Sequence, residues 1–275
     1  MATWQRLLKN WNGLGGLGLV VLYIAVALLS PLISPHDPLE MNMEALLQPP
    51  NRQFLLGTDD YGRDIMSRLF VGARSSLKIT LLAVFGASVL GTMMGVMSGY
   101  LGGWIDGLTM RLVDIMFSFP GLILALVIVA MLGPSEENVI LAISIRSIPV
   151  FARTARGPTL SVKEEEYVAA IRAVGAQPVR IILRHILPNV MAPIVVQVTL
   201  ALAAGVLTDA SLSFLGLGVQ PPTPSWGSMV NEARSNMEFA PWTVVSPSVC
   251  IALAVLGFNL LGDGLRDVLD PRLRQ

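Results

Sequence analysis

Long apolar segments recur along this chain, and they constrain its fold more than any other feature. A helix needs about 20 mostly apolar residues to cross the hydrocarbon core of a bilayer, which is about 30 Å thick. Six segments reach or approach this length: Leu14–Ile33, Leu77–Gly99, Ile115–Leu132, Val139–Ala155, Val190–Gly216 and Val244–Gly262. The fourth is the weakest, because two arginines interrupt it. The sequence therefore predicts an all-α, polytopic membrane bundle of about six transmembrane helices.

The composition agrees with a protein whose solvent is partly lipid. Only 14% of the 275 residues are charged, against about 25% in an ordinary soluble domain. Lys plus Arg and Asp plus Glu are both 19, so no basic excess points to nucleic acid. A single cysteine excludes an intrachain disulfide, and neither of the two histidines lies at metal-ligand spacing. We expect no metal site and no catalytic residues.

The distribution of basic residues predicts the orientation in the membrane. With the N-terminus inside, the inner segments hold twelve Lys and Arg residues and the outer segments hold six. This positive-inside bias predicts that both termini are cytoplasmic. We read the first apolar segment as an uncleaved span, because it is longer than the apolar region of a signal peptide. The chain divides into an N-terminal part, residues 1–76, with the first span and an extracytoplasmic segment, and a five-span core, residues 77–275.

A polar cytoplasmic loop, residues 156–189, lies between the fourth and fifth spans, and its first half has a helical pattern. The residues Tyr167, Ala170, Ile171 and Val174 have the spacing of one apolar stripe. The three consecutive glutamates at 164–166 are expected in the first turn, where the helix dipole favours acids. Gly175 is expected to end this helix.

The second half of the loop predicts another short helix. Pro178 suits its first position. An apolar stripe again follows, formed by Val179, Ile182, Leu183 and Ile186, while Arg180 and Arg184 project elsewhere; Pro188 is expected to end the helix. A paired helical knob of this kind suits insertion into a groove of a partner. An amphipathic hairpin resting on the bilayer has the same pattern, and both alternatives stay open.

Two charges inside the apolar segments are candidates for function. Asp209 lies near the outer end of the fifth span, where it either faces a translocation route or reaches the interface. Arg146 lies two helical turns before Arg153 and so on a similar face. We hypothesise that Arg146 lines a pathway; the alternatives are a structural ion pair or snorkelling. The spacing Gly91-x-x-x-Gly95-x-x-x-Gly99 predicts close helix packing, more readily within the chain than between subunits.

Another candidate site precedes the second span, in the extracytoplasmic segment. Gly57 and Gly62 allow tight turns, and Asp59, Arg63 and Asp64 are able to cap and pair locally. The spacing does not match an EF-hand loop. A structural role is the preferred interpretation over ligand binding.

Three ordered motifs resemble one family of membrane proteins. Ala169-Ala170-Ile171, then Gly175, then Ile186-Leu187-Pro188, resemble the cytoplasmic EAA loop of binding-protein-dependent ABC permeases, with Ala169 in place of the leading Glu. The run Leu56–Asp64 resembles the GTDxxGRD signature of the peptide and nickel importer branch. The run Ser211–Gly218, with Pro221-Pro222 and Ser225-Trp226-Gly227, resembles its SFLGLG…PPxPxWG segment. The resemblance covers nearly the whole chain.

The resemblance implies a type I ABC importer permease core in the cell inner membrane. It implies transport of dipeptides, oligopeptides or a related small solute, such as a nickel complex or glutathione. It also implies three kinds of partner: a second homologous permease, two ATP-binding cassette ATPase subunits and an extracytoplasmic substrate-binding protein. The implied ATPase-coupling residues are Glu166, Tyr167, Ala169, Ala170, Arg172, Gly175, Arg180, Arg184, Leu187 and Pro188.

The chain has no G-x-x-x-x-G-K-[ST] phosphate loop, so ATP and Mg²⁺ are expected on the partner ATPases and not on this chain. We therefore expect a transport subunit and not an enzyme. An ATP-independent channel or secondary carrier is the alternative, although it leaves the cytoplasmic hairpin unexplained. An intramembrane enzyme would need paired acids, a histidine cluster or a Ser–His arrangement, and the sequence offers none of these.

Overall fold

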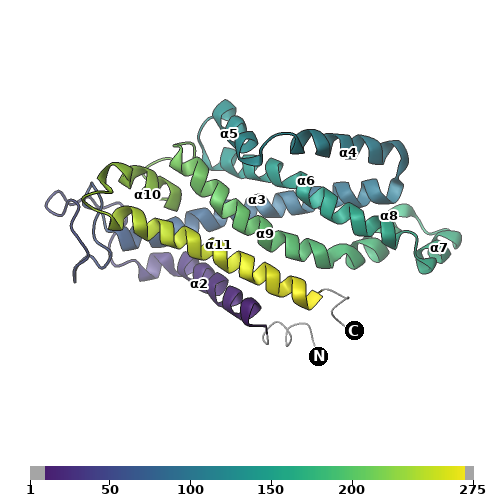
Figure 1. Ribbon diagram of the computed structural model, residues 1–275, viewed down its shortest axis with the longest axis horizontal. Helices are drawn as coiled ribbons and strands as arrows, with labels where there is room; N and C mark the ends of the chain where they lie inside the picture. The colour runs from purple at the N-terminus through teal and green to yellow at the C-terminus, as the bar shows by residue number, and fades with distance from the viewer. Residues whose placement is uncertain (1–9, 270–275) are drawn as a thin grey trace.

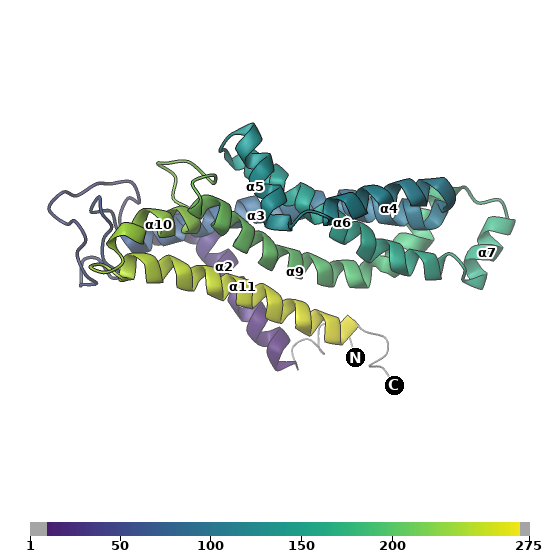
Figure 2. The ribbon, with the colours of Figure 1, turned by 45° about the horizontal axis from the view of Figure 1, so that its top comes forward.

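The computed structural model describes residues 10–269, which form an elongated helical bundle (Figure 1). Its helices are α2 (Trp11–Ile33), α3 (Ile65–Leu101), α4 (Gly103–Phe117), α5 (Gly121–Leu132), α6 (Glu136–Val162), α7 (Glu166–Ala173), α8 (Pro178–Ile181), the π-helical turn η1 (Ile182–Ile186), α9 (Leu187–Phe214), α10 (Trp226–Ala233), the 3₁₀ turn η2 (Arg234–Asn236) and α11 (Trp242–Leu269). The long helices follow the long axis of the molecule. The loop before α3 and helix α10 lie at one end, and α7 lies at the other (Figures 1 and 2).

The prediction of about six helical spans is confirmed. Among the described residues, five helices are long and apolar enough to cross a membrane: α2, α3, α6, the continuous run from α8 to α9, and α11. Helices α4 and α5 together form a sixth candidate, bent by 87°. The third span is therefore not the straight helix predicted over Ile115–Leu132. The break falls at Ser118–Pro120, where the fixed φ of proline and its missing N–H favour a new helix start.

Helix α3 begins earlier than predicted, at Ile65 and not at Leu77. The Asp64 side chain caps it by accepting a hydrogen bond from the backbone N–H of Ser67 at 2.9 Å. Charged residues in the first turns, such as Arg68, lower the local hydropathy, so an apolar-segment search does not detect this part of the helix. The boundary placed after residue 76 therefore falls inside α3, and the irregular segment ends at Asp64.

The glycine stripe of α3 packs against α6, as the intramolecular interpretation predicted. A Cβ atom at Gly91 would lie 2.5 Å from the carbonyl oxygen of Ile148, and one at Gly95 would lie 2.1 Å from that of Ala152. No side chain fits at these distances. The two helix backbones therefore touch along this stripe, which places α6 at a fixed depth and rotation against α3.

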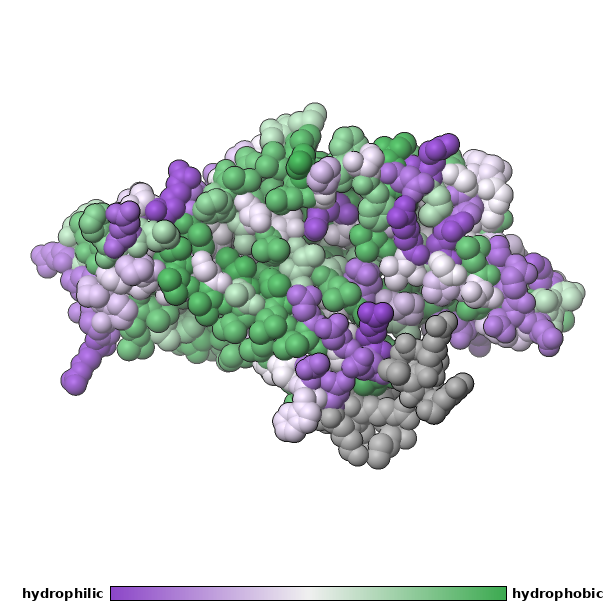
Figure 3. All heavy atoms as spheres, viewed as in Figure 1, coloured by the Kyte–Doolittle hydropathy of each residue, from purple (hydrophilic) through white to green (hydrophobic). Residues whose placement is uncertain are grey.

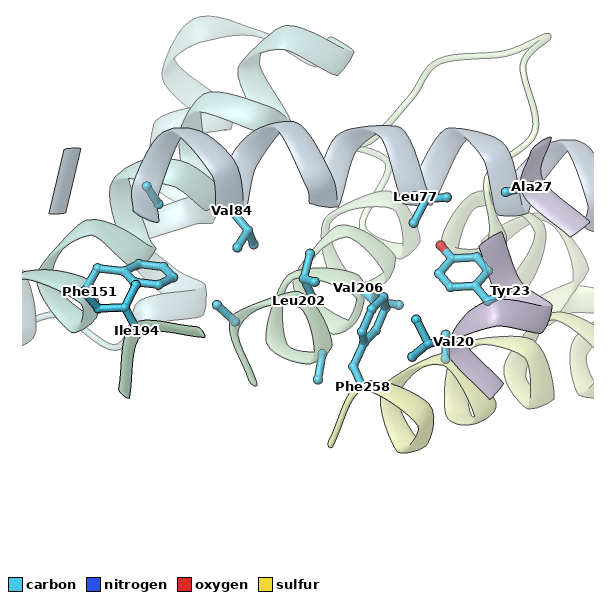
Figure 4. Close-up of a cluster of buried hydrophobic side chains, with 14 of the residues drawn as sticks. Val20, Tyr23, Ala27, Leu77, Val84, Phe151, Ile194, Leu202, Val206 and Phe258 are labelled. Atoms are coloured by element: carbon cyan, nitrogen blue, oxygen red, sulfur yellow. The ribbon is translucent and has the colours of Figure 1, made fainter. Parts of the chain in front are cut away.

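The buried core also contains side chains of α2 and α11, the first and last described helices, which pack with α3 and α6. The ring of Tyr23 on α2 packs at a tilt against Trp226 of α10, with 5.1 Å between ring centroids. Tyr23 also meets Phe258 of α11 edge-on at 6.1 Å (Figure 4). Asn10 donates a hydrogen bond to Asp267 at 2.9 Å, so the start of α2 and the end of α11 lie together. Arg6, Lys9, Arg272 and Arg274, which contribute to the predicted orientation, lie outside the described residues.

The outer surface of the bundle is apolar over much of its length. Figure 3 shows hydrophobic residues covering the middle of the molecule and hydrophilic residues gathered at the α7 end. Large apolar side chains such as Leu22, Phe85 and Met131 are exposed. Contiguous exposed apolar area on this scale indicates contact with lipid or with other subunits.

Candidate functional sites

Helix α7 carries the first half of the predicted coupling loop and projects from the bundle (Figure 2). Its only buried residue is Val168. Of the four residues in the predicted apolar stripe, Tyr167, Ala170 and Val174 are exposed, Val174 to 89%, and Ile171 is half-buried. Only Glu166 of the three glutamates lies in the first turn, because Glu165 is the N-cap. A helix with no neighbour on that side leaves its apolar residues in solvent.

Gly175 ends α7 as predicted. Its φ of +88° is in the left-handed region, where glycine has no Cβ penalty. The N–H of Gly175 donates to the carbonyl of Arg172 at 3.0 Å, and the N–H of Ala176 donates to that of Ile171 at 3.3 Å. This pair of bonds is a Schellman motif, and it satisfies two carbonyls of the last turn.

The second half of the loop continues into the membrane helix without a break. Pro178 takes the first turn of α8, as predicted. Pro188 does not end the helix: the chain passes from α8 through η1 into α9, with Pro188 in the first turn of α9. The wider turn of a π-helix tolerates the proline ring and its missing N–H. In the second predicted stripe, Ile182 and Ile186 are buried while Val179 and Leu183 are exposed.

The predicted coupling residues lie together at this end of the molecule, and most face outward. Ala169, Ala170, Arg172, Arg180, Arg184 and Pro188 are exposed, whereas Leu187 is half-buried. Asn189 fastens the two halves of the loop. Its amide donates to the Tyr167 hydroxyl at 3.1 Å and to the carbonyl of His185 at 2.6 Å. The result is a small helical knob with an exposed face.

At the opposite end of the molecule, the Leu56–Asp64 motif forms local turns and hydrogen bonds just before α3. Gly57 and Gly62 have φ values of +79° and +71°. The carboxylate of Asp59 accepts hydrogen bonds from the backbone N–H of Arg63 and from its guanidinium, at 2.9 and 2.7 Å. Asp64 caps α3. The local turns, cap and pairing expected of these residues are present.

This motif is also tied to α10 by a buried ion-pair network that the sequence did not reveal. Arg63 and Arg68 donate to the same carboxylate oxygen of Glu232, at 2.8 and 2.9 Å. Arg68 is only 1% exposed and also lies 3.4 Å from Asp59. Nothing in the local sequence pairs residues so far apart along the chain. We name Asp59, Arg63, Arg68 and Glu232 the outer cluster.

Two acids of the outer cluster, together with the neighbouring Asp60, form a group of carboxylates of the kind that can bind a cation. Carboxylate oxygens of Asp59, Asp60 and Glu232 lie within 4.8 Å of one another. Two arginines already neutralise Asp59 and Glu232. Burial, and then the charge of Asp59, raise the pKa of Asp60 above its usual value. These features fit a structural network better than metal binding.

Arg146 lies in the middle of α6 and has no carboxylate partner within 4.0 Å among residues 10–269. Its guanidinium donates to the hydroxyl of Thr208 on α9 at 3.0 Å. It lines a cavity of about 250 Å³ between α4, α5, α6 and α9, together with Gln197 and Phe117. Arg153 instead pairs with Asp114 of α4 at 2.5 Å. The two arginines therefore meet different helices and do not share a partner.

Asp209 is fully buried between α9 and α3, with 0% exposure. It accepts a hydrogen bond from the Ser76 hydroxyl at 2.8 Å. It does not reach the interface, which was one of the two alternatives, and it is not among the residues that line the Arg146 cavity. Its place in the fold is a polar link between two spans.

Further polar links fasten α6 to α4 and to α3, and sequence reasoning missed them. Arg156 forms two hydrogen bonds with Asp106, both at 2.6 Å. Lys163 donates to the carbonyl oxygen of Gly99 at 2.9 Å. Arg153 and Arg156 of α6 pair with Asp114 and Asp106 of α4. Opposite charges on two neighbouring segments could have indicated this pairing, but α4 itself was not predicted as a helix.

Comparison with known proteins fits this arrangement. Residues 91–275 match the binding-protein-dependent transport system inner membrane component family, and residues 2–50 match the N-terminal transmembrane domain of oligopeptide transport permease C. The chain is 46% identical to the dipeptide transport system permease protein DppC of Alkalihalophilus pseudofirmus, covering 99% of this chain and 90% of that one. It is also 46% identical to the glutathione transport system permease protein GsiD of Escherichia coli, covering 98% and 90%.

A solved structure shares the fold. A chain of the MetNI methionine ABC transporter, in an inward-facing conformation, aligns with a TM-score of 0.61 at 21% identity, covering 74% of this chain and 97% of that chain. The protein described here is therefore a multi-pass membrane transport component. It belongs to the inner membrane component family of binding-protein-dependent transport systems, as a permease subunit of an ABC importer. A stand-alone channel or carrier does not fit a binding-protein-dependent family.

Proposed function

We propose that this chain forms half of the translocation pathway of an importer for dipeptides or short peptides, including glutathione. The relatives named for dipeptide and glutathione transport support this choice of solute. The other half is a second permease of similar fold. An extracytoplasmic binding protein delivers the solute at the end that carries the outer cluster. In this orientation the α7 end and both termini are cytoplasmic, in the inner membrane.

The observation that carries the proposal is the projecting knob of α7 and α8. It presents exposed apolar residues, Val174 and Val179, beside exposed Arg172 and Arg180. A short helix with an apolar tip and a charged rim suits a groove on another protein. We assign this groove to the ATPase subunits, which bind ATP and Mg²⁺. The coupling residues are those predicted from 166 to 188.

The continuous helix supplies the mechanical link in this proposal. Because the chain runs from α8 through η1 into α9 without a break, movement of the knob is transmitted along α9 toward Thr208 and the Arg146 cavity. Closure of the ATPase pair on ATP would shift both knobs and rotate the spans from inward-facing to outward-facing. Release after hydrolysis would reverse the change. Arg146 lines the pathway, and Asp209 positions α9 against α3.

The test is reconstitution of the complete transporter, with its own ATPases, second permease and binding protein, in proteoliposomes. We expect ATP-dependent uptake of dialanine, of glutathione, or of both. Val174→Asp should abolish uptake and release the ATPases in a detergent pull-down, because it places a charge at the tip of the knob. Met43→Asp, at another exposed apolar position at the opposite end, is the control and should retain the ATPases.

Two results would contradict the proposal in different ways. Retained ATPase association and normal uptake in Val174→Asp would exclude the knob as the coupling contact. Failure of the intact complex to take up either peptide would exclude the proposed solute class.

A further inference from the structure

The guanidinium of Arg146 differs from those of four other arginines on or next to the long helices. Arg63, Arg68, Arg153 and Arg156 each lie within 4.0 Å of a carboxylate. Within residues 10–269, Arg146 has only the neutral hydroxyl of Thr208 as a hydrogen-bond partner. An arginine inside the membrane is costly unless an anion or water compensates its charge.

Thr208 is arranged to hold this arginine in place. Its hydroxyl donates its proton to the carbonyl oxygen of Ala204 at 2.7 Å. The hydroxyl oxygen is then free to accept from Arg146 at 3.0 Å. One edge of the guanidinium is fixed by this bond, and its remaining N–H donors have no protein acceptor among the described residues. The arginine is therefore oriented but not neutralised.

The first turn of α5 adds a second source of positive potential at the same place. A Cβ atom on Gly121 would lie 2.6 Å from Nε of Arg146, so the arginine rests directly against the start of this helix. No side chain caps the start of α5, and its first turn contains no acid. The free N–H groups and the helix dipole make this terminus positive. Arg146 and the helix start therefore reinforce each other.

The cavity beside Arg146 has the shape and lining of a small-molecule site. Its volume is about 250 Å³, and its walls combine apolar side chains such as Phe117 and Leu124 with the polar groups of Arg146, Ser147 and Gln197. A mostly apolar cavity with a few convergent polar groups is the usual form of a ligand site. A cavity of this size and lining suits a small side chain together with one charged group.

The depth of Arg146 excludes a lipid headgroup as the natural occupant. Arg146 lies ten residues after Glu136, the first residue of α6. At 1.5 Å per residue this is about 15 Å along the helix, which is half the thickness of a hydrocarbon core. Lipid phosphates lie outside that core. The occupant is therefore an anionic group that travels to the middle of the membrane.

We propose that Arg146, supported by the first turn of α5, binds the carboxylate of the transported solute in the pathway. This inference rests on the proposed function, since peptides and glutathione both carry a free carboxylate. A planar carboxylate matches the two parallel N–H donors of a guanidinium. The apolar walls would then contact the adjacent side chain of the peptide. Binding here compensates the charge of Arg146 only while solute is present.

The experiment compares each peptide with its carboxamide form. Uptake of dialanine, dialanine amide, glutathione and the glutathione carboxamide at its glycine end is measured in the reconstituted wild-type complex, at binding-protein concentrations that saturate for each compound. Wild type should prefer the acid over the amide. Arg146→Gln should reduce acid uptake about tenfold, the equivalent of one charged hydrogen bond, and bring the acid-to-amide ratio close to one. Arg146→Lys should keep part of the preference.

Arg111→Gln is the matched control, since Arg111 is an exposed arginine on α4 away from the cavity. It should leave the ratio unchanged. Melting temperatures of the purified complexes separate lost binding from lost folding. An Arg146→Gln complex that folds and lowers acid and amide uptake equally, or lowers neither, would overturn the carboxylate site while leaving the importer assignment intact. A wild-type complex that takes up neither peptide would refute the solute class and the site with it.

Discussion

The two ends of this permease are built in opposite ways. At the outer end, residues 34–64 close onto α10 through the outer cluster, whose Arg68 is almost completely buried and bonded to Glu232 and Asp59. At the other end, α7 contributes one buried residue, Val168, to the core, and Asn189 donates a hydrogen bond to its Tyr167 hydroxyl. One end is fastened by long-range ion pairs, and the other by short-range hydrogen bonds.

The difference teaches where the molecule is complete and where it requires a partner. Buried charges at the outer end are compensated within the chain, so this end is stable by itself. The knob leaves apolar side chains in solvent and makes few tertiary contacts, which is expected of a surface that becomes buried on assembly. A mutation at the outer end should therefore alter folding, whereas one in the knob should alter coupling.

The largest effect is expected from Arg68→Met. Removal of this guanidinium leaves the carboxylates of Glu232 and Asp59 with Arg63 as their one remaining arginine partner among the described residues, so two negative charges then share one cation. Breaking one partner of a buried ion pair costs about 3 kcal/mol of stability or more. We expect a clear fall in the melting temperature of the purified subunit complex, measured by thermal denaturation in detergent. Arg52→Met is the control, since Arg52 is exposed in the same segment. Equal melting temperatures for both variants would contradict the contrast between the ends.

A smaller, pH-dependent effect on the melting temperature is expected from replacing Asp60. Burial and the neighbouring charge of Asp59 raise its pKa in the folded protein. The folded state then binds the proton more tightly than the unfolded state, so the contribution of Asp60 to stability falls as pH rises from its unfolded pKa through its folded pKa. Asp60→Asn removes this dependence. The melting temperature of wild type should therefore decline relative to Asp60→Asn between pH 4 and pH 7. A constant difference across this range would exclude the effect.

The share of the fold and of the candidate sites that the sequence predicts differs between the two ends. The spans, the Gly91–Gly95–Gly99 stripe and the stop at Gly175 follow from residue spacing and local backbone chemistry, and they were predicted. The outer cluster was not, because Arg63 and Glu232 are far apart in sequence and only the folded bundle brings them together. The same holds for the Arg146 site, which depends on the break before α5.

The errors at the knob have a local cause. Periodicity identifies the apolar side of a helix but does not say whether this chain covers that side, and in α7 Val174 is 89% exposed. Pro188 was expected to end a helix, but the π-helical turn η1 absorbs the missing N–H. Local rules succeed where the chain interacts with itself over one turn. They fail where a partner, or an irregular turn, decides the outcome.

The smallest effect on global stability is expected from adding one methyl group at Gly175. Nothing lies within 4 Å of a Cβ atom there, so Gly175→Ala meets no steric obstacle, and the change acts only on a backbone with φ of +88°. An L-residue in this region costs roughly 1 to 2 kcal/mol. Because few contacts connect α7 to the bundle, this energy should loosen α7 without lowering the melting temperature. Hydrogen exchange should become faster at residues 166–176 and stay unchanged in α3.

Gly157→Ala adds the same methyl group to open space inside α6, where alanine favours the helix by about 1 kcal/mol. The two substitutions should therefore act in opposite directions, and faster exchange throughout the bundle in Gly175→Ala would show that the knob is a structural part of the membrane domain.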